Sequence, residues 1–300
     1  MTDVLSDVLS HLDITTVRCT RLEATGSWAL HFDLRSHFKF ISVVKGDAWL
    51  IVDGHDPFRL ERGDLFLLAS SASYTVGSDP DLPALDGLAA FDWTQNLTAN
   101  LGGDDTVMLG GALDVHGSAI DFLFEALPSV IHIPASLAAA EALRLSLALL
   151  EIEVTGSGTG HAVTTHKLAE VLFVQALRLY SADMGAQRAA WLTALADPRI
   201  GRILNLIHAD PARRWTVDDM AELAGMSRSS FATAFAAKVG MPPLSYLQRW
   251  RMERARTELR KDRHSTAQIA NAIGYSSEAA FGAAYKRQFG RSPGMDRNQQ

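Results

Sequence analysis

Histidine is the residue type in this sequence best suited to holding a metal ion, and its spacing argues against that use. No two histidines of the first half form the HxH or HExxH spacings that bring two imidazoles onto one ion. The single cysteine, Cys19, can neither form an internal disulfide nor build a thiolate site alone. We therefore predict no metal, no cofactor and no catalytic set. The histidines interpreted as solvated or hydrogen-bonded side chains are His31, His37, His55, His116 and His132.

Arginine and lysine, the other chemistry-bearing group, are concentrated in the last third of the chain. The net charge is −14 over residues 1–197 and +8 over residues 198–300, within a total of −6. A basic segment on an acidic body is typical of a nucleic-acid-binding module attached to a different domain. A charged surface that is merely solvated would not concentrate its excess in one segment. The charge pattern therefore predicts a nucleic-acid partner.

The basic segment contains one pattern written twice, over 216–294. Four pairs of residues match at an offset of 50: Phe231/Phe281, Phe235/Tyr285, Gly240/Gly290 and Pro243/Pro293. Gly225 and Gly274 match at an offset of 49. Such a repeat predicts two copies of one supersecondary unit, here a helix-turn-helix.

Start and stop signals position these helices. Thr216 and Ser227 are predicted N-caps in the first copy, and Ser265 with Gln268 forms a capping box in the second. Ser277 opens the final helix, and glycines supply the turns. A long helix over 244–261 joins the copies, and its five arginines are expected in solvent.

The chain before residue 198 predicts a different architecture. Short apolar runs at 50–52 and 65–68, separated by glycine and aspartate turns, indicate an antiparallel β-barrel or sandwich. Strands are expected again over 106–115 and 129–133, with loops over 80–87 and 94–105 and a short helix around 119–127. Two apolar helices are expected over 136–154 and 161–182. The fold class is thus two-domain α+β. The predicted boundaries are 1–185 for an effector or dimerisation domain, 186–197 for a junction and 198–300 for an all-α DNA-binding domain.

The segment 35–76 resembles the core of a cupin barrel, through Gly46-x5-Val52-Asp-Gly54 and Leu60-Glu-Arg-Gly63-Asp64. Metal-binding cupins place histidines where this sequence has Lys39 and Tyr74. A catalytic metal usually needs three protein ligands, so a cupin enzyme is disfavoured. We expect a non-enzymatic cupin-like domain. Its candidate effector pocket is lined by Trp28, His37, Trp49 and Tyr74.

The doubled helix-turn-helix, ending Lys-Arg-x-Phe-Gly-x-Ser-Pro at 286–293, resembles the AraC/XylS family of bacterial transcription regulators over about 100 residues. The resemblance implies a sequence-specific regulator whose two recognition helices enter successive major grooves of promoter or operator DNA, about 34 Å apart. Expected base contacts come from Arg228, Ser229, Thr233, Glu278 and Ala279. Expected phosphate contacts come from Arg213, Arg214, Lys238, Lys286, Arg287 and Arg291.

One departure from the family concerns the recognition helices. Where the family commonly has an arginine, this sequence has Thr233 and Ala283. An arginine bidentate to guanine contributes roughly 1–3 kcal/mol of discrimination per base pair. We therefore expect the second unit to hold DNA mainly through phosphate and shape contacts.

The remaining expectations concern partners and location. A small-molecule effector would act on the cupin-like domain, and the two apolar helices would form a homodimer. An activator would also contact RNA polymerase. With no run of 18 apolar residues and no signal-peptide pattern, we expect a cytoplasmic protein without a membrane segment. The alternatives are a ligand-independent DNA-binding dimer and a cupin enzyme with a DNA-binding appendage.

Overall fold

The computed structural model describes residues 4–10, 13–33, 38–69, 73–93, 97–116, 127–156, 158–183, 194–195 and 197–297. The chain divides into two compact units, each described here by itself. One comprises 14–115 and 127–184, and the other comprises 1–13, 116–126 and 185–300. We call them the β unit and the helical unit.

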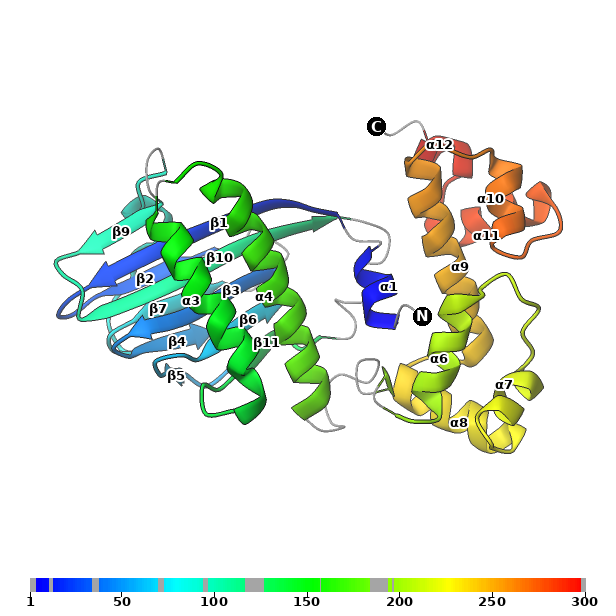
Figure 1. The fold of residues 1–300 in the computed structure, drawn as a ribbon, viewed down its shortest axis with the longest axis horizontal. Coiled ribbons are helices and arrows are strands. Elements are labelled where there is room, and N and C mark those ends of the chain that lie inside the picture. The colour runs from blue at the N-terminus through cyan, green and yellow to red at the C-terminus, as the bar shows by residue number, and fades with distance from the viewer. Residues whose placement is uncertain are drawn as a thin grey trace. The chain divides into compact units, whose positions relative to one another are not determined.

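Two sheets make up the β unit (Figure 1). The larger has the order β11-β6-β3-β10-β1-β9 and the smaller has the order β5-β4-β7-β2-β8. The strands of the larger sheet are β1 (Asp13–Ala24), β3 (Phe38–Lys45), β6 (Leu65–Ala69), β9 (Thr98–Leu101), β10 (Thr106–His116) and β11 (Val130–Ile133). Those of the smaller sheet are β2 (Ala29–Phe32), β4 (Ala48–Val52), β5 (Phe58–Leu60), β7 (Tyr74–Gly77) and β8 (Leu85–Asp86).

Alternation along the strands places the core of the β unit between the sheets. In β4, Ala48, Leu50 and Val52 are buried, whereas the residues between them are only half-buried. The buried cluster draws on both sheets, for example Leu30 of β2 and Ile41 of β3. The turn between β3 and β4 requires Gly46, which has φ +74° and whose added Cβ would lie 2.5 Å from a backbone carbonyl oxygen.

Two long helices cover one face of the larger sheet, shown in green in Figure 1. They are α3 (Glu141–Thr155) and α4 (His161–Asp183), preceded by the short 3-10 turn η2 (Ala138–Ala140). Phe173 of α4 packs against Phe38 of β3 at 4.7 Å between ring centroids. Arg21 of β1 reaches Glu151 of α3 at 3.3 Å. These contacts fix the helices on the sheet.

The helical unit contains the two expected helix-turn-helix motifs. The first comprises α6 (Ile200–Ala209), α7 (Val217–Leu223) and α8 (Arg228–Val239). The second comprises α10 (Thr266–Ala272), α11 (Glu278–Phe289) and α12 (Pro293–Arg297), and α9 (Pro243–Arg260) joins the two. None of the described helices is both long and apolar enough to cross a membrane.

An N-terminal helix, α1 (Val4–Ser10), was not expected from the sequence. It belongs to the helical unit, where it packs against α6. The Asp7 carboxylate accepts a hydrogen bond from Nδ1 of His208 at 2.8 Å, and Nε2 of His208 lies 2.7 Å from the Tyr246 hydroxyl. The His208 ring also stacks on Trp250 at 4.1 Å. Residues from both ends of the chain therefore share one core.

Several expectations need correction. Parts of both expected loops are strands, β8 and β9, and these pair in parallel with β2 and β1. The arginines of α9 are half-buried rather than solvated. Arg251 shows the reason, because its guanidinium donates to the carbonyl oxygens of Pro211 and Arg213 at 2.6 and 2.8 Å. The helix expected around 119–127 lies almost wholly outside the described residues, as does most of the 186–197 junction.

Candidate nucleic-acid interface and effector cavity

Capping interactions set the first recognition helix, α8, in place. Thr216 and Asp219 form a capping box at the start of α7, and the Ser227 hydroxyl accepts from the Ser230 amide at the start of α8. Phe231 and Phe235, one turn apart, are fully buried. That burial turns the opposite face of α8 outward, and Arg228, Ser229 and Thr233 are exposed on it.

Arg228 has a neighbour that the sequence pattern did not reveal. Its Nη1 donates to Oδ2 of Asp218 at 3.0 Å. Both side chains are about two-thirds exposed, at 68% and 64%. An exposed pair of this kind contributes little to stability, so the guanidinium can exchange partners readily.

The second recognition helix, α11, is built in the same way. Ser265 and Gln268 form a capping box, and the Ser277 hydroxyl accepts from the Ala280 amide. Phe281 and Tyr285 are fully buried. The exposed positions in front of them are Glu278, Ala279 and Ala283. This surface carries a carboxylate and two methyl groups where α8 carries a guanidinium and two hydroxyls.

The six residues expected to contact phosphates are placed differently from one another. Lys286 and Arg287 are exposed on α11, and the Arg213 guanidinium stacks on Trp215 at 4.2 Å. Lys238 reaches Asp197 at 3.0 Å. Nε of Arg291 lies 2.8 Å from Oδ1 of the buried Asp296.

A polar groove between the two motifs brings cations together from three elements. It has a volume of about 480 Å³ and is lined by Arg214, Arg251 of α9 and Arg287 of α11. Trp215 and Tyr275 form part of its wall. Burial lowers the pKa of Arg251, whereas the electrostatic effects of Tyr275 and Asp210 raise it by less. The groove thus offers guanidinium groups to an anion such as a phosphate.

Asp296 anchors the end of the second motif. It is 1% exposed, and Oδ2 accepts from the Tyr285 hydroxyl at 2.5 Å. Arg256 and Arg291 approach its two oxygens at 3.5 and 2.8 Å. Burial raises the pKa of Tyr285, and the hydrogen bond to Asp296 adds to that rise. The two arginines compensate the buried carboxylate.

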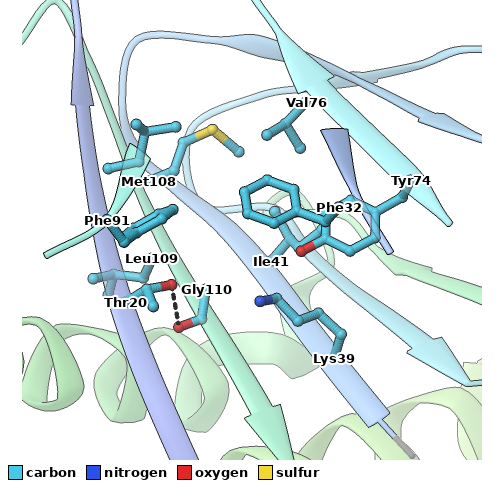
Figure 2. Close-up of a pocket in the computed structure, with 11 residues that line it drawn as sticks. Thr20, Phe32, Lys39, Ile41, Tyr74, Val76, Phe91, Met108, Leu109 and Gly110 are labelled. Carbon is cyan, nitrogen blue, oxygen red and sulfur yellow. Dashed lines mark hydrogen bonds between the residues drawn. The ribbon is translucent and has the colours of Figure 1, made fainter. Parts of the chain in front are cut away.

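The β unit contains a small cavity between its sheets, with a volume of about 30 Å³, enough for about two water molecules. Figure 2 shows its lining residues. Tyr74, expected at an effector pocket, is among them. Most of the lining is apolar: Leu22, Ile41, Val76, Phe91, Met108 and Leu109.

The other three residues expected at that pocket do not line this cavity. Trp28 is buried in the surrounding core. Trp49 lies on the other face of β4 from Leu50, as the alternation of the strand requires, and is half-buried. His37 is outside the described residues.

Lys39, which was not among the expected pocket residues, lines the cavity. Its Nζ lies 5.5 Å from the centroid of the Phe32 ring and 5.8 Å from that of Tyr74. Burial lowers the pKa of Lys39 to about 8, with the Cys19 thiol and the Arg18 guanidinium as weaker influences. The sequence does contain a signal for Lys39 as a cavity residue, because it occupies a position where metal-binding cupins have a ligand.

Across the described residues, no group of three or more His, Cys, Asp or Glu side chains could hold a metal ion. Three histidines of the β unit instead have hydrogen-bond partners. His31 lies 3.0 Å from the Thr75 hydroxyl, and His55 lies 2.9 Å from the Ser129 hydroxyl. His132 lies 3.1 Å from Asp64. The side chain of His116 is not described.

Comparisons with known proteins agree with this two-part organisation. A family model described as a cupin matches residues 3–182, and one described as a helix-turn-helix domain matches residues 220–299. A protein of Streptomyces lividans named as an AraC-like transcription regulator is 38% identical over 294 residues, covering 97% of each chain. The HTH-type transcriptional regulator AlkR of Acinetobacter baylyi is 31% identical over 312 residues, covering 99% of each chain. These relatives are regulators rather than enzymes.

One solved structure with a similar helical part is the DNA-binding domain of AdpA, described as a global transcriptional factor in complex with a target DNA. It is 26% identical and covers 34% of this chain and 91% of that chain, with a TM-score of 0.33. A TM-score of this size supports no inference about geometry.

Proposed function

The chain belongs to the AraC-like transcription regulators, with a cupin domain ahead of its DNA-binding helices, and we propose that α8 and α11 read one promoter or operator site while the β unit senses a small molecule. The observation that carries the proposal is the repetition of one capped, aromatic-anchored recognition helix, joined through α9. A helix fits the major groove of DNA, and its first turn meets the base edges. Two such helices would read successive grooves about 34 Å apart.

The two recognition helices would contribute unequally. On α8, Arg228, Ser229 and Thr233 present donors to base edges, and Arg228 can form the bidentate contact to guanine. On α11, Glu278 and Ala279 offer no cation. We therefore propose that α8 carries most of the sequence preference and that α11 acts mainly through backbone and shape contacts.

Phosphate contacts would come from both motifs. Lys286 and Arg287 are exposed in the last turn of α11, and Arg213 and Arg214 precede α7. Lys238 and Arg291 remain in the proposed set, although each must exchange or share an acidic partner to reach a phosphate. Such contacts fix the position of the protein without reading sequence.

In-vitro selection of bound DNA, followed by footprinting, tests whether α8 contributes more than α11 to the sequence preference. Arg228→Ala should relax the base preference at one half-site, where each good bidentate contact contributes roughly 1–3 kcal/mol. Lys286→Ala should weaken binding to all sequences alike and lower the salt dependence by about one phosphate contact. Sharp base preferences under α11 that survive Arg228→Ala would contradict the proposal.

We also propose that the chain dimerises through α3 and α4. Leu145, Leu149 and Ile152 recur at helical spacing on α3 and are 62%, 53% and 65% exposed, and Val163 at the start of α4 is 68% exposed. Single exposed apolar residues are ordinary, whereas a stripe marks an interaction surface. A second copy would bury the stripe symmetrically. Sedimentation velocity should show a dimer for the wild type and a monomer for Leu149→Glu.

The location and the regulatory outcome follow from the DNA target. A regulator of promoters acts where the bacterial chromosome lies, so we place the chain in the cytoplasm. Activation would require contact with RNA polymerase, whereas repression would require only occupancy of the site. Transcription in vitro with purified polymerase, with and without the bound site, distinguishes them. DNA affinity unchanged by every candidate effector would favour a ligand-independent dimer.

A further inference from the structure

The cavity of the β unit combines apolar walls with one cation. Lys39 extends from β3 so that its amino group points into the space between Phe32, Tyr74 and Gly110, as Figure 2 shows. A Cβ built on Gly110 would lie 3.9 Å from Nζ of Lys39, so the amine lies within van der Waals reach of β10. The amino group therefore borders the empty space itself.

That amino group has no anionic partner among the described residues, and no hydrogen bond from it is formed there. The acidic group that acts on Lys39 electrostatically is the thiol of Cys19, and burial raises the pKa of that thiol to about 12. Cys19 is therefore neutral at physiological pH and cannot serve as a counterion. Arg18, which also acts on Lys39 electrostatically, is itself a cation and cannot be the partner either. Buried ammonium groups are normally paired, so the missing anion needs an explanation.

The Tyr74 phenol, which also lines the cavity, is a donor too, whereas the Thr20 hydroxyl already donates to the Gly110 carbonyl oxygen. Burial raises the pKa of the Tyr74 phenol above its usual range, so the hydroxyl keeps its proton. It forms no hydrogen bond with the described residues. Two donors, one of them charged, thus face a space that no carboxylate of the described residues lines. The group that complements them is an acceptor with a negative charge.

We propose that this cavity binds a small apolar monocarboxylate, with the carboxylate between Lys39 and Tyr74 and the hydrocarbon part against Phe32, Phe91 and Met108. The proposal rests on the effector role proposed above for the β unit. A carboxylate head is about the size of two water molecules, which is the room that the cavity offers. The hydrocarbon part needs more room, and Phe91 can yield most easily because it follows the short turn η1 (Leu88–Ala90) outside any strand.

A different chemistry for the same amine is imine formation. The neutral amine would attack the carbonyl carbon of an aldehyde to form a carbinolamine. The carbonyl oxygen would then leave as water, taking up the two protons that the nitrogen loses, and a carbon–nitrogen double bond would form. This route needs an uncharged amine, whereas the carboxylate needs a protonated one. The two chemistries therefore respond oppositely to pH. Borohydride would make the imine permanent by reducing it and would leave a bound carboxylate unchanged.

Calorimetric titration of the full-length protein with butanoate, hexanoate and octanoate, each against the alcohol of equal length, tests the proposal. At pH 7 each carboxylate should bind at least about tenfold more tightly than its alcohol, because the hydrogen bonds are charge-assisted. Affinity should rise up to about fourfold per added methylene until the space is filled. Above pH 8 the affinity for carboxylates should fall, and that for alcohols should not change.

Three variants sharpen the result. Lys39→Met should abolish the preference for carboxylates, Lys39→Arg should keep part of it and Tyr74→Phe should reduce it severalfold. Lys45→Met, on an exposed lysine at the end of the same strand, is the matched control and should bind hexanoate like the wild type. Each variant should bind the selected DNA site as tightly as the wild type does without ligand, so loss of ligand binding alone leaves the DNA-binding function intact.

Three results would overturn the proposal. One is equal affinity of the wild type for hexanoate and hexan-1-ol, and another is the absence of carboxylate binding at millimolar concentration. The third is covalent attachment of hexanal to Lys39 after borohydride treatment in a protein that does not bind hexanoate.

Discussion

Replacing Lys39 by methionine should stabilise the β unit. Methionine keeps the length and apolar stem of lysine but removes the charge. Burial lowers the pKa of Lys39 from 10.5 to about 8, and each pKa unit corresponds to 1.36 kcal/mol. The ammonium has no anionic partner among the described residues, so its burial destabilises the folded state by at most about 3 kcal/mol. We expect the free energy of unfolding of Lys39→Met at pH 7 to exceed that of the wild type by about 2–3 kcal/mol.

The stability gained by Lys39→Met should decrease as the pH rises. Below pH 8 the amine is protonated in both the folded and unfolded chains, so its cost is fully present. Between pH 8 and 10.5 the unfolded chain still binds the proton while the folded chain has lost it, so wild-type stability rises with pH. The difference between variant and wild type should therefore shrink across this window and vanish above it. Other titrations are common to both proteins and cancel.

Urea unfolding at several pH values measures this difference. Tryptophan fluorescence reports on Trp28 in the same core, and the midpoint shift at constant slope gives the free-energy difference. Lys45→Met, which removes an exposed pair with Asp104, should change stability by less than about 1 kcal/mol. A Lys39→Met protein less stable than the wild type at pH 7, or a difference that stays constant to pH 10.5, would refute the reasoning.

Further predictions concern the helical unit. Asp296→Ala should destabilise the second motif by about 3–5 kcal/mol, because two arginines lose their buried partner. Tyr285→Phe removes one hydrogen bond and should destabilise it by only about 1 kcal/mol. Hydrogen exchange of the α11 amides measures both effects. Gly274→Ala should unfold the second motif at lower urea than Gly225→Ala, since both glycines have positive φ but only at Gly274 would the new Cβ lie 2.4 Å from a backbone carbonyl oxygen. Asp218→Asn should increase DNA affinity at low salt, because it removes an exposed carboxylate from beside the first recognition helix; unchanged binding would indicate that this carboxylate lies away from the DNA.

The helical unit was the more predictable part of the chain, because its signals act over a few residues. The capping boxes at Thr216 and Ser265 join atoms three positions apart, and Phe231 and Phe235 fall on one helical face by spacing alone. Contacts between distant segments could not be predicted in this way. Arg251 looks like a solvated helix residue until α9 is packed against carbonyl groups 38 and 40 positions earlier.

The cavity shows the same limit on the β unit. In the sequence, Lys39 appears only as a position where a metal ligand is missing, and Tyr74 appears both as such a position and as one of four expected pocket residues. Their shared cavity follows from β3 and β7 facing each other across two different sheets, and no local pattern encodes which strands those are. Trp49 shows the opposite case. Its aromatic character suggested a pocket, but the two-residue period of β4 decides the face.

The helix α1 has a consequence for dissecting this regulator genetically. It buries Val4, Leu5 and Val8 within the helical unit, although the chain runs through the whole β unit before it reaches α6. A fragment limited to residues 198–300 would leave His208 without Asp7. Substitutions within the first ten codons should therefore be recovered in screens for defective DNA binding, together with those affecting the helix-turn-helix motifs.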